Sequence, residues 1–334
     1  MRQLQVGLLG GGSWGTTIAS LVARNAPVRL WARDAATVDE INSRHTNEKY
    51  LPGARLNENL IATTDIREAV TGADVLVIGV PSQYVRDALE AIHAHIRPWV
   101  PVISLAKGLE AGSGKRMTEI IAEVLPEHPA GVLTGPNLAR EIMAGSAAAS
   151  VIAMEDETIN RALQRLFSSG LFRVYTNDDV IGCELGGVLK NVIAIAVGMG
   201  DGQGAGDNTR AALICRGLAE ITRLGVAMGG QPTTFAGLAG LGDLVATCTS
   251  AQSRNRHVGL ELSRGRTIED IVSSMYMVAE GVKSAPMVMA LAERHGVDMP
   301  LAREVYEVVR GRSSARKALR GLLRTAAGAE SEAG

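Results

Sequence analysis

The chain has 334 residues, enough for about two domains, and 46% of them are hydrophobic while 21% are charged. This composition excludes a disordered chain and a membrane protein. Lys and Arg number 34 against 35 Asp and Glu, so the net charge of −1 provides no basic excess for binding nucleic acid or an anionic membrane. The longest uncharged stretch, residues 224–242, contains six glycines and a proline, and we therefore expect no membrane span.

The spacing of cysteines and histidines argues against disulfides and metals. The three cysteines lie far apart, at positions 183, 215 and 248, and the six histidines show no zinc-binding motif. The amino terminus enters an apolar segment directly, without the basic and long apolar regions of a signal peptide. We therefore expect no metal site and a location in the reducing cytoplasm.

In chain order, the first 175 residues alternate short apolar runs with longer mixed segments, which is typical of a parallel sheet flanked by helices. From about residue 179, apolar and small residues recur without strand-like alternation, which favours a helical domain. We predict an α/β domain over residues 1–180, an all-α domain over residues 181–325 and a mobile tail over residues 326–334. Strands are predicted at residues 5–9, 28–31, 75–80, 100–104, 131–134, 149–154 and 172–175.

The first predicted strand ends in a glycine-rich loop, GGGSWG, and a helix is predicted to follow it. Gly10, Gly12 and Gly15 fit the GxGxxG pattern, in which glycines permit a tight turn, close approach of the backbone to a pyrophosphate, and close helix–strand packing. The amides at the start of the helix would favour phosphate. A tight turn without a ligand is the alternative, but the strand before and the helix after favour a Rossmann-type dinucleotide site.

The end of the second predicted strand carries Arg33 and Asp34, at the place where the adenosine ribose of a dinucleotide binds. Arg33 could pair with a 2′-phosphate, whereas Asp34 could accept a hydrogen bond from a free 2′-hydroxyl. We favour NADP as the cofactor, with NAD tolerated. A solvated surface position for Arg33 is the alternative.

Two charged residues stand alone in apolar surroundings. Lys190 is the single charge in a helix-like run from Leu185 to Val197, and Asp243 is the single charge between Gln231 and Ser253. An unpaired buried charge is costly, so we expect the two to be partners and Lys190 to exchange protons near neutral pH. The alternatives are a lysine that extends to the surface and an aspartate that caps a helix.

Three further segments carry groups suited to a phosphate. The cluster Ser253-Arg254-Asn255-Arg256-His257 offers forked and neutral hydrogen bonds, with an exposed basic helix start as the alternative. Lys107 follows a predicted strand, at the carboxyl end where doubly wound sheets bind ligands. Gly135 begins another turn after a strand, and the amides of that turn could lie beside a nicotinamide or a substrate.

Together, these motifs resemble the bacterial NAD(P)-dependent sn-glycerol-3-phosphate dehydrogenases. The resemblance covers residues 7 to about 285, and the blocks occur in the order of the family. It implies a Rossmann-type α/β domain joined to an all-α domain of the 6-phosphogluconate-dehydrogenase-like type. The matching blocks are GGGSWG (10–15), KGLE (107–110), GPNLARE (135–141), ELGGVLKN (184–191), DGQGAGDN (201–208), RGL (216–218), GLAGLGD (237–243), SRNR (253–256) and EG (280–281).

The resemblance also implies a role for each matched residue. Lys190 is similar to the group that exchanges a proton with the C2 oxygen of the substrate, and Lys107 and Asp243 complete the implied catalytic set. Cofactor contacts are implied for Gly10, Gly12, Ser13, Trp14, Gly15, Arg33, Lys107, Ala139, Arg254 and Glu280. Substrate contacts are implied for Lys107, Gly135, Asn137, Lys190, Asp243, Ser253, Arg254 and Asn255.

The reaction implied is reversible reduction of dihydroxyacetone phosphate to sn-glycerol 3-phosphate for glycerophospholipid synthesis, with NADP or NAD as cofactor and a homodimer as the assembly. One alternative is a dehydrogenase of the same plan that acts on a hydroxy acid such as 3-hydroxyisobutyrate or 6-phosphogluconate. The SRNR and GLAGLGD blocks disfavour it. A second alternative is a non-catalytic NADP-binding sensor, which the joint presence of Lys107, Lys190 and Asp243 disfavours.

Overall fold

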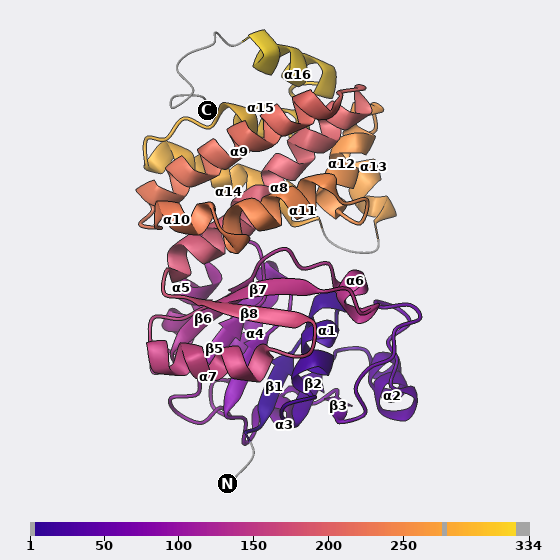
Figure 1. Cartoon of the computed structure of the whole chain (residues 1–334), viewed down its shortest axis with the longest axis vertical. Helices are drawn as coiled ribbons and strands as arrows, with labels where there is room; N and C mark the ends of the chain where they lie inside the picture. The colour runs from indigo at the N-terminus through magenta and orange to yellow at the C-terminus, as the bar shows by residue number, and fades with distance from the viewer. Residues whose placement is uncertain (1–3, 276–278, 325–334) are drawn as a thin grey trace. The chain divides into compact units, whose positions relative to one another are not determined.

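The computed structural model describes residues 4–275 and 279–324, and the chain forms two compact units (Figure 1). The sheet unit comprises Met1–Lys107 and Lys115–Val180, and the helical unit comprises Gly108–Gly114 and Ile181–Gly334. The tail predicted over residues 326–334 lies outside the described residues.

The sheet unit is built on one eight-stranded sheet with the order β3-β2-β1-β4-β5-β6-β7-β8. The first six positions follow the doubly wound order of a Rossmann fold, and two strands extend it. The predicted Rossmann-type α/β fold is thereby confirmed. The strands are β1 (Val6–Leu9), β2 (Val28–Trp31), β3 (Leu60–Thr63), β4 (Val75–Ile78), β5 (Val102–Ser104), β6 (Ala130–Thr134), β7 (Ala148–Ala153) and β8 (Phe172–Asn177).

Two features of the sheet depart from the sequence-based prediction. Strand β3 was not predicted, because it has only four residues and its apolar Ile61 is 53% exposed at the sheet edge. Strand β7 runs antiparallel to β6, with Val132 opposite Ala153, whereas an entirely parallel sheet was expected. The connection between these strands holds only the five-residue helix α6 (Ala139–Met143), and a parallel crossover usually needs a longer helix.

Helices cover both faces of the sheet, and alternate strand residues enter two separate cores. In β4, Val75 and Val77 face the cluster formed with α1, α2 and α7, whereas Leu76 and Ile78 face the cluster formed with α3, α4 and α5. This two-sided burial explains why β4 is apolar at every position. The helices are α1 (Ser13–Val22), α2 (Ala35–Arg44), α3 (Ile66–Val70), η1 (Ser82–Tyr84), α4 (Val85–Ile92), α5 (Met117–Val124), α6 and α7 (Glu157–Phe167).

The described residues from 181 to 324 form helices and loops without a strand, as predicted for an all-α unit. The helices of this part are α8 (Val180–Gly202), α9 (Asp207–Ala227), α10 (Pro232–Phe235), the π-helical turn η2 (Leu238–Gly242), α11 (Asp243–Thr249), α12 (Arg254–Ser263), α13 (Ile268–Ser274), α14 (Glu280–Arg294), α15 (Pro300–Val309) and α16 (Ala315–Arg324).

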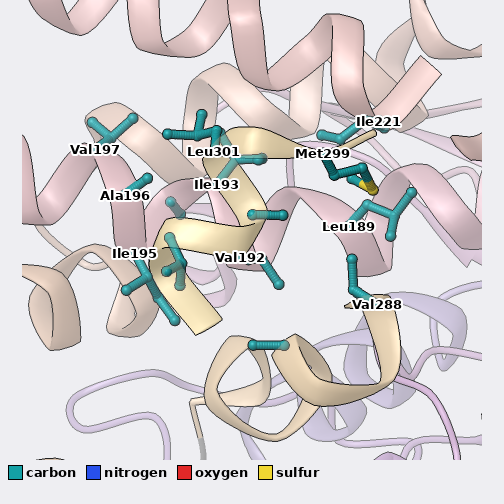
Figure 2. Close-up of a cluster of buried hydrophobic side chains, with 14 of the residues drawn as sticks. Leu189, Val192, Ile193, Ile195, Ala196, Val197, Ile221, Val288, Met299 and Leu301 are labelled. Carbon is teal, nitrogen blue, oxygen red and sulfur yellow. The ribbon is translucent and has the colours of Figure 1, made fainter. Parts of the chain in front are cut away.

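Helix α8 forms the centre of the helical unit. It is long and apolar enough to cross a membrane, but 94% of its most apolar window is buried inside the protein. Figure 2 shows Leu189 and Ile193 of α8 among apolar side chains of other helices. These include Ile221 of α9, Val288 of α14 and Leu301 of α15. The length and composition of α8 are therefore those of a core helix.

Two helices of this unit meet backbone to backbone. A Cβ on Gly198 of α8 would lie 2.0 Å from the carbonyl oxygen of Arg256, and one on Gly259 of α12 would lie 2.1 Å from that of Ile195. Only glycine fits at both positions, so α12 is held at a fixed, short distance from α8.

The helical unit also contains a segment from much earlier in the chain. Residues 108–114 group with this unit, and the side chain of Leu109, at 0% exposure, belongs to its apolar core. The core of the helical unit is therefore assembled from two separate stretches of sequence.

Candidate active site

The carboxyl end of β1 carries the glycine-rich loop, in which each glycine has a distinct steric role. Gly10 has a φ of +124°, and a Cβ on it would lie 2.6 Å from the backbone of Gly79. A Cβ on Gly15 would lie 2.0 Å from the carbonyl oxygen of Gly10, so only glycine lets α1 pack this closely. A Cβ on Gly12 would meet nothing within 4 Å, which leaves its backbone open to an approaching group.

The first turn of α1 follows this loop and suits an anion. Gly12 is the N-cap residue without a capping side chain, and the first turn has no acidic residue. Ser13 and Trp14 are half buried there, and the indole Nε1 of Trp14 is buried without an acceptor among the described residues. These features fit the pyrophosphate of a dinucleotide, which the amides from Gly12 to Gly15 would hold.

At the end of β2, Arg33 and Asp34 have different surroundings. Arg33 is exposed and makes no hydrogen bond to the part of the chain that the structure describes. Asp34 caps α2 by accepting from the Ala36 amide at 3.2 Å, and it pairs with Lys49 at 2.9 Å between Oδ2 and Nζ. Its hydrogen bond with the Lys49 ammonium is the main reason that the pKa of Asp34 is below its usual range. The carboxylate of Asp34 is thus already engaged, whereas the guanidinium of Arg33 faces solvent.

Three predicted site residues come together at the carboxyl ends of β5 and β6. The Nζ atom of Lys107 donates to the carbonyl oxygen of Gly135 at 2.8 Å, and Gly135 has a φ of +132°. In the side chain of Asn137, Nδ2 donates to the Ala149 carbonyl at 3.1 Å and Oδ1 accepts from Ser150 Oγ at 3.0 Å. This edge is where doubly wound sheets bind ligands.

Ala139, a further predicted cofactor contact, begins α6 directly after this turn and is half buried against the core of the sheet unit. Its amide is one of the first in that helix.

In the helical unit, the two isolated charges predicted to be partners form one buried group. Nζ of Lys190 on α8 lies 2.6 Å from Oδ1 of Asp243, and their side chains are 6% and 2% exposed. The same ammonium donates to Oγ1 of Thr247 at 2.5 Å. Lys190 therefore does not reach the surface, and Asp243 does not cap α11, because Gly242 holds the N-cap position.

A second buried network joins three of the sequence blocks. The amide nitrogen of Asn255 donates to Oδ1 of Asn191 at 2.9 Å, and its oxygen accepts from the backbone of Gly281 at 3.0 Å. A Cβ on Gly281 would lie 2.6 Å from the carbonyl oxygen of Asn191. The LKN, SRNR and EG blocks thus lie together, although they come from α8, α12 and α14.

The start of α12 presents the remaining predicted groups. Ser253 is the N-cap residue and accepts from the Arg256 amide at 3.2 Å, and Arg254 beside it is exposed. Glu280, the first residue of α14, is half buried. Arg256, in contrast, pairs with the buried Asp201 at 2.7 Å and so anchors the helix.

Sequence reasoning missed Thr247 and Lys49, each of which contacts a predicted residue. Thr247 lies four residues after Asp243 on α11, a spacing that places both on one helix face and could have revealed it. Lys49 lies in a polar loop that carries no recognisable motif, so its pairing with Asp34 has no sequence signal.

A Rossmann sheet with an open glycine loop, followed by a helical unit with a buried Lys–Asp pair, defines the class of dinucleotide-dependent dehydrogenases. Two family models match the chain and agree with this class. The N-terminal model of NAD-dependent glycerol-3-phosphate dehydrogenase matches residues 5–160, and the C-terminal model matches residues 179–320.

Individual relatives match over nearly the whole chain. Glycerol-3-phosphate dehydrogenase [NAD(P)+] 2 of Sphingopyxis alaskensis is 69% identical over 99% of this chain and 100% of its own length. Glycerol-3-phosphate dehydrogenase [NAD(P)+] 1 of Mycobacterium tuberculosis is 54% identical over 98% of this chain and 97% of its own length. The crystal structure of glycerol-3-phosphate dehydrogenase from Coxiella burnetii superimposes with a TM-score of 0.92 at 37% identity, covering 96% of this chain and 99% of that one.

The chain therefore belongs to the NAD-dependent glycerol-3-phosphate dehydrogenase family. Membership places it among the oxidoreductases that use NAD or NADP, and the resemblance inferred from the sequence motifs is confirmed.

Proposed function

We propose that this chain catalyses the reversible reduction of dihydroxyacetone phosphate to sn-glycerol 3-phosphate, the backbone of glycerophospholipids. The observation that carries the proposal is the buried ammonium of Lys190, held by Asp243 and Thr247 in a chain of this family. A buried cation with two fixed acceptors is suited to giving a proton to an oxygen that gains negative charge.

The dinucleotide, when bound, supplies or accepts the hydride at C2 of the substrate. Lys190 donates a proton from Nζ to the C2 oxygen during reduction and takes it back during oxidation. Asp243 fixes the direction of that ammonium through the 2.6 Å contact, and Thr247 holds it from a second side. The C2 carbonyl group thus gains one hydride on carbon and one proton on oxygen and becomes the alcohol, and the neutral Lys190 regains its proton from solvent.

Cationic and amide donors would hold the phosphate of the substrate. Arg254 is exposed at the first position of α12, where the helix amides also favour an anion. Ser253 still has its hydroxyl proton to donate, because its oxygen acts as the acceptor in the cap. Lys107, Gly135 and Asn137 are the proposed substrate contacts in the sheet unit, and Lys107 also contacts the cofactor in this proposal.

NADP is the preferred cofactor in this proposal. The carboxylate of Asp34 is occupied by the α2 cap and by Lys49, so it is a poor acceptor for the 2′-hydroxyl of NAD. Arg33 is exposed next to it and suits a 2′-phosphate.

Replacing Lys49 tests this preference. In Lys49→Met, the charge of Asp34 is no longer compensated and would repel a 2′-phosphate. We expect the ratio of kcat/KM for NADPH to that for NADH to fall several-fold, because the uncompensated carboxylate lies next to Arg33 in the sequence. Lys317→Met, which removes an exposed lysine of α16, should leave the ratio unchanged. An unchanged ratio in Lys49→Met would contradict a role for Lys49 in selecting the cofactor.

The first experiment is the loss of reduced-nicotinamide absorbance with dihydroxyacetone phosphate, in parallel with NADPH and NADH. Rapid oxidation is expected, faster at low concentration with NADPH. Parallel reactions with 3-hydroxyisobutyrate or 6-phosphogluconate and the oxidised cofactors serve as controls for the related dehydrogenases. Oxidation only with a hydroxy acid would overturn the substrate assignment, and no reaction with any of them would favour a sensor.

The cytoplasm and a homodimer complete the proposal. The cytoplasm is supported by the spacing of the three cysteines, which is not that of a disulfide framework. Light scattering on the purified protein gives the mass of the assembly, and twice the mass of the chain is the expected result.

A further inference from the structure

A buried side chain outside the family blocks contacts the glycine-rich loop. Asn47 lies between α2 and β3 and is 0% exposed. Its Nδ2 donates to the carbonyl oxygen of Gly11 at 3.1 Å and to Oγ1 of Thr16 at 3.0 Å. One amide therefore joins the loop to the first turns of α1.

Asn47 is itself firmly held. The backbone carbonyl oxygen of Asn47 accepts from the backbone amides of Tyr50 at 3.1 Å and Leu51 at 2.7 Å, which closes a turn. The side chain of Leu51, 1% exposed, belongs to the apolar core of the sheet unit. The donor group is thus anchored by a buried leucine four residues later.

The contact with Gly11 determines where the next amide points. In a planar trans peptide the carbonyl and the following N–H point in opposite directions. Because Asn47 binds the Gly11 carbonyl, the N–H of Gly12 points away from Asn47. Gly12 is the residue whose added Cβ would meet nothing within 4 Å, so its backbone is accessible from outside.

The side chain of Asn47 is held through one group. Oδ1 of Asn47 is buried and has no donor among the described residues. The two hydrogen bonds from Nδ2, to Gly11 and Thr16, are therefore the polar contacts that fix this side chain against the loop and α1.

We propose that Asn47 is a positioning residue for the cofactor, which holds the glycine loop with the Gly12 amide directed at the dinucleotide pyrophosphate. This inference rests on the proposed dinucleotide-dependent function. Asn47 acts through Gly11 and Thr16 and does not itself touch the cofactor.

The chain offers a closely matched control. Asn160 of α7 is also buried, donates from Nδ2 to two backbone carbonyls, those of Met154 and Asn177, and also has an unpartnered Oδ1. It lies in the same unit but contacts neither the glycine loop nor α1 through these bonds. If Asn47 served only the stability of the fold, its replacement should affect Tm and Kd in the same way as replacement of Asn160.

The test compares Asn47→Ala with Asn160→Ala in the full chain, by nicotinamide fluorescence for binding and by Tm for stability. Asn47→Ala should raise the Kd for NADPH about tenfold, as expected when one to two hydrogen bonds between the glycine loop and the pyrophosphate are lost. The kcat at saturating NADPH should stay near that of the wild type. The Kd of Asn47→Ala for adenosine 2′,5′-bisphosphate, which lacks a pyrophosphate and is measured by its displacement of NADPH, should change much less. Asn160→Ala should lower Tm without changing either Kd.

The outcomes separate this inference from the function it rests on. Equal losses of Tm with unchanged Kd in both variants would overturn the positioning role alone. A wild-type protein that binds no dinucleotide would overturn both. If Asn47→Ala does not fold, Thr16→Val removes one of the two anchors at nearly constant volume, and an unchanged Kd for NADPH there would equally overturn the inference.

Discussion

Lys190 keeps its ammonium inside the helical unit because protein oxygens replace the water that it lost. A buried ion pair contributes little net stability, yet removal of one partner leaves an uncompensated charge and is destabilising by about 3–5 kcal/mol. The 2.6 Å contact with Asp243 is thus better explained by chemistry than by stability. A pair of apolar residues would serve the fold at least as well.

Replacement of Lys190 should separate turnover from cofactor binding. In Lys190→Met we expect kcat to fall by about 10²- to 10⁴-fold, the usual contribution of a positioned proton donor, with the Kd for NADPH unchanged. The double variant Lys190→Met with Asp243→Leu should recover stability in urea unfolding but not kcat, because neither charge of the pair remains. Near-normal turnover in either variant would exclude Lys190 as the proton donor.

Residues of the site differ in how far the sequence alone predicts them. The pairing of Lys190 with Asp243 is predictable because a lone charge in an apolar run needs a partner. Thr247 is marked only by its spacing of four residues from Asp243 on one helix face. Asn47 is uncharged, and buried Asn residues are common enough that nothing in its neighbourhood marks it. Its role emerges only from a contact between segments distant in the sequence.

At the scale of elements, apolar runs predict the central strands because each is buried on both faces. Strand β3 is missed because one of its four residues faces solvent, and the reversal of β7 is missed because strand direction depends on the connection. The close approach of α8 and α12 is equally hidden, since Gly198 and Gly259 resemble other glycines of this glycine-rich chain.

The variant Gly259→Ala tests the close contact between α8 and α12. Alanine normally stabilises a helix interior by about 1 kcal/mol relative to glycine, but here its Cβ would meet the Ile195 carbonyl at 2.1 Å. We expect the free energy of unfolding in urea to fall by about 1–3 kcal/mol or more. Gly206→Ala, where a Cβ would meet nothing within 4 Å, should change it by less than about 1 kcal/mol. Equal effects would contradict the close approach.

At the scale of the whole molecule, Glu220 couples folding to pH. Its buried carboxylate on α9 accepts from the amides of Leu301 at 2.6 Å and Ala302 at 3.0 Å, at the start of α15. Burial raises the pKa of Glu220 to about 7, and the two amides only partly oppose this. Between pH 4.5, the ordinary pKa of a glutamate, and about pH 7, the folded chain binds more protons than the unfolded one.

Stability should therefore fall as the pH rises. The contribution of Glu220 to the free energy of unfolding is fully present below about pH 4.5 and is lost as the pH passes about 7. The total loss is about 3 kcal/mol. Urea unfolding from pH 5 to 8 should show this decline in the wild type, and Glu220→Gln should lack it. The same dependence on pH in both proteins would assign it to other groups.

Leu109 comes from the segment 108–114 but packs in the core of the helical unit, so this unit cannot be produced as one continuous stretch of the chain without losing part of its core. A polypeptide that starts at residue 181 would lack a fully buried leucine of its own core, and the loss of such a side chain typically costs about 2–5 kcal/mol. Exchange of the helical unit between relatives as one contiguous block would therefore pair each core with a foreign segment 108–114. Chimeras that transfer this short segment together with residues 181–324 should fold best.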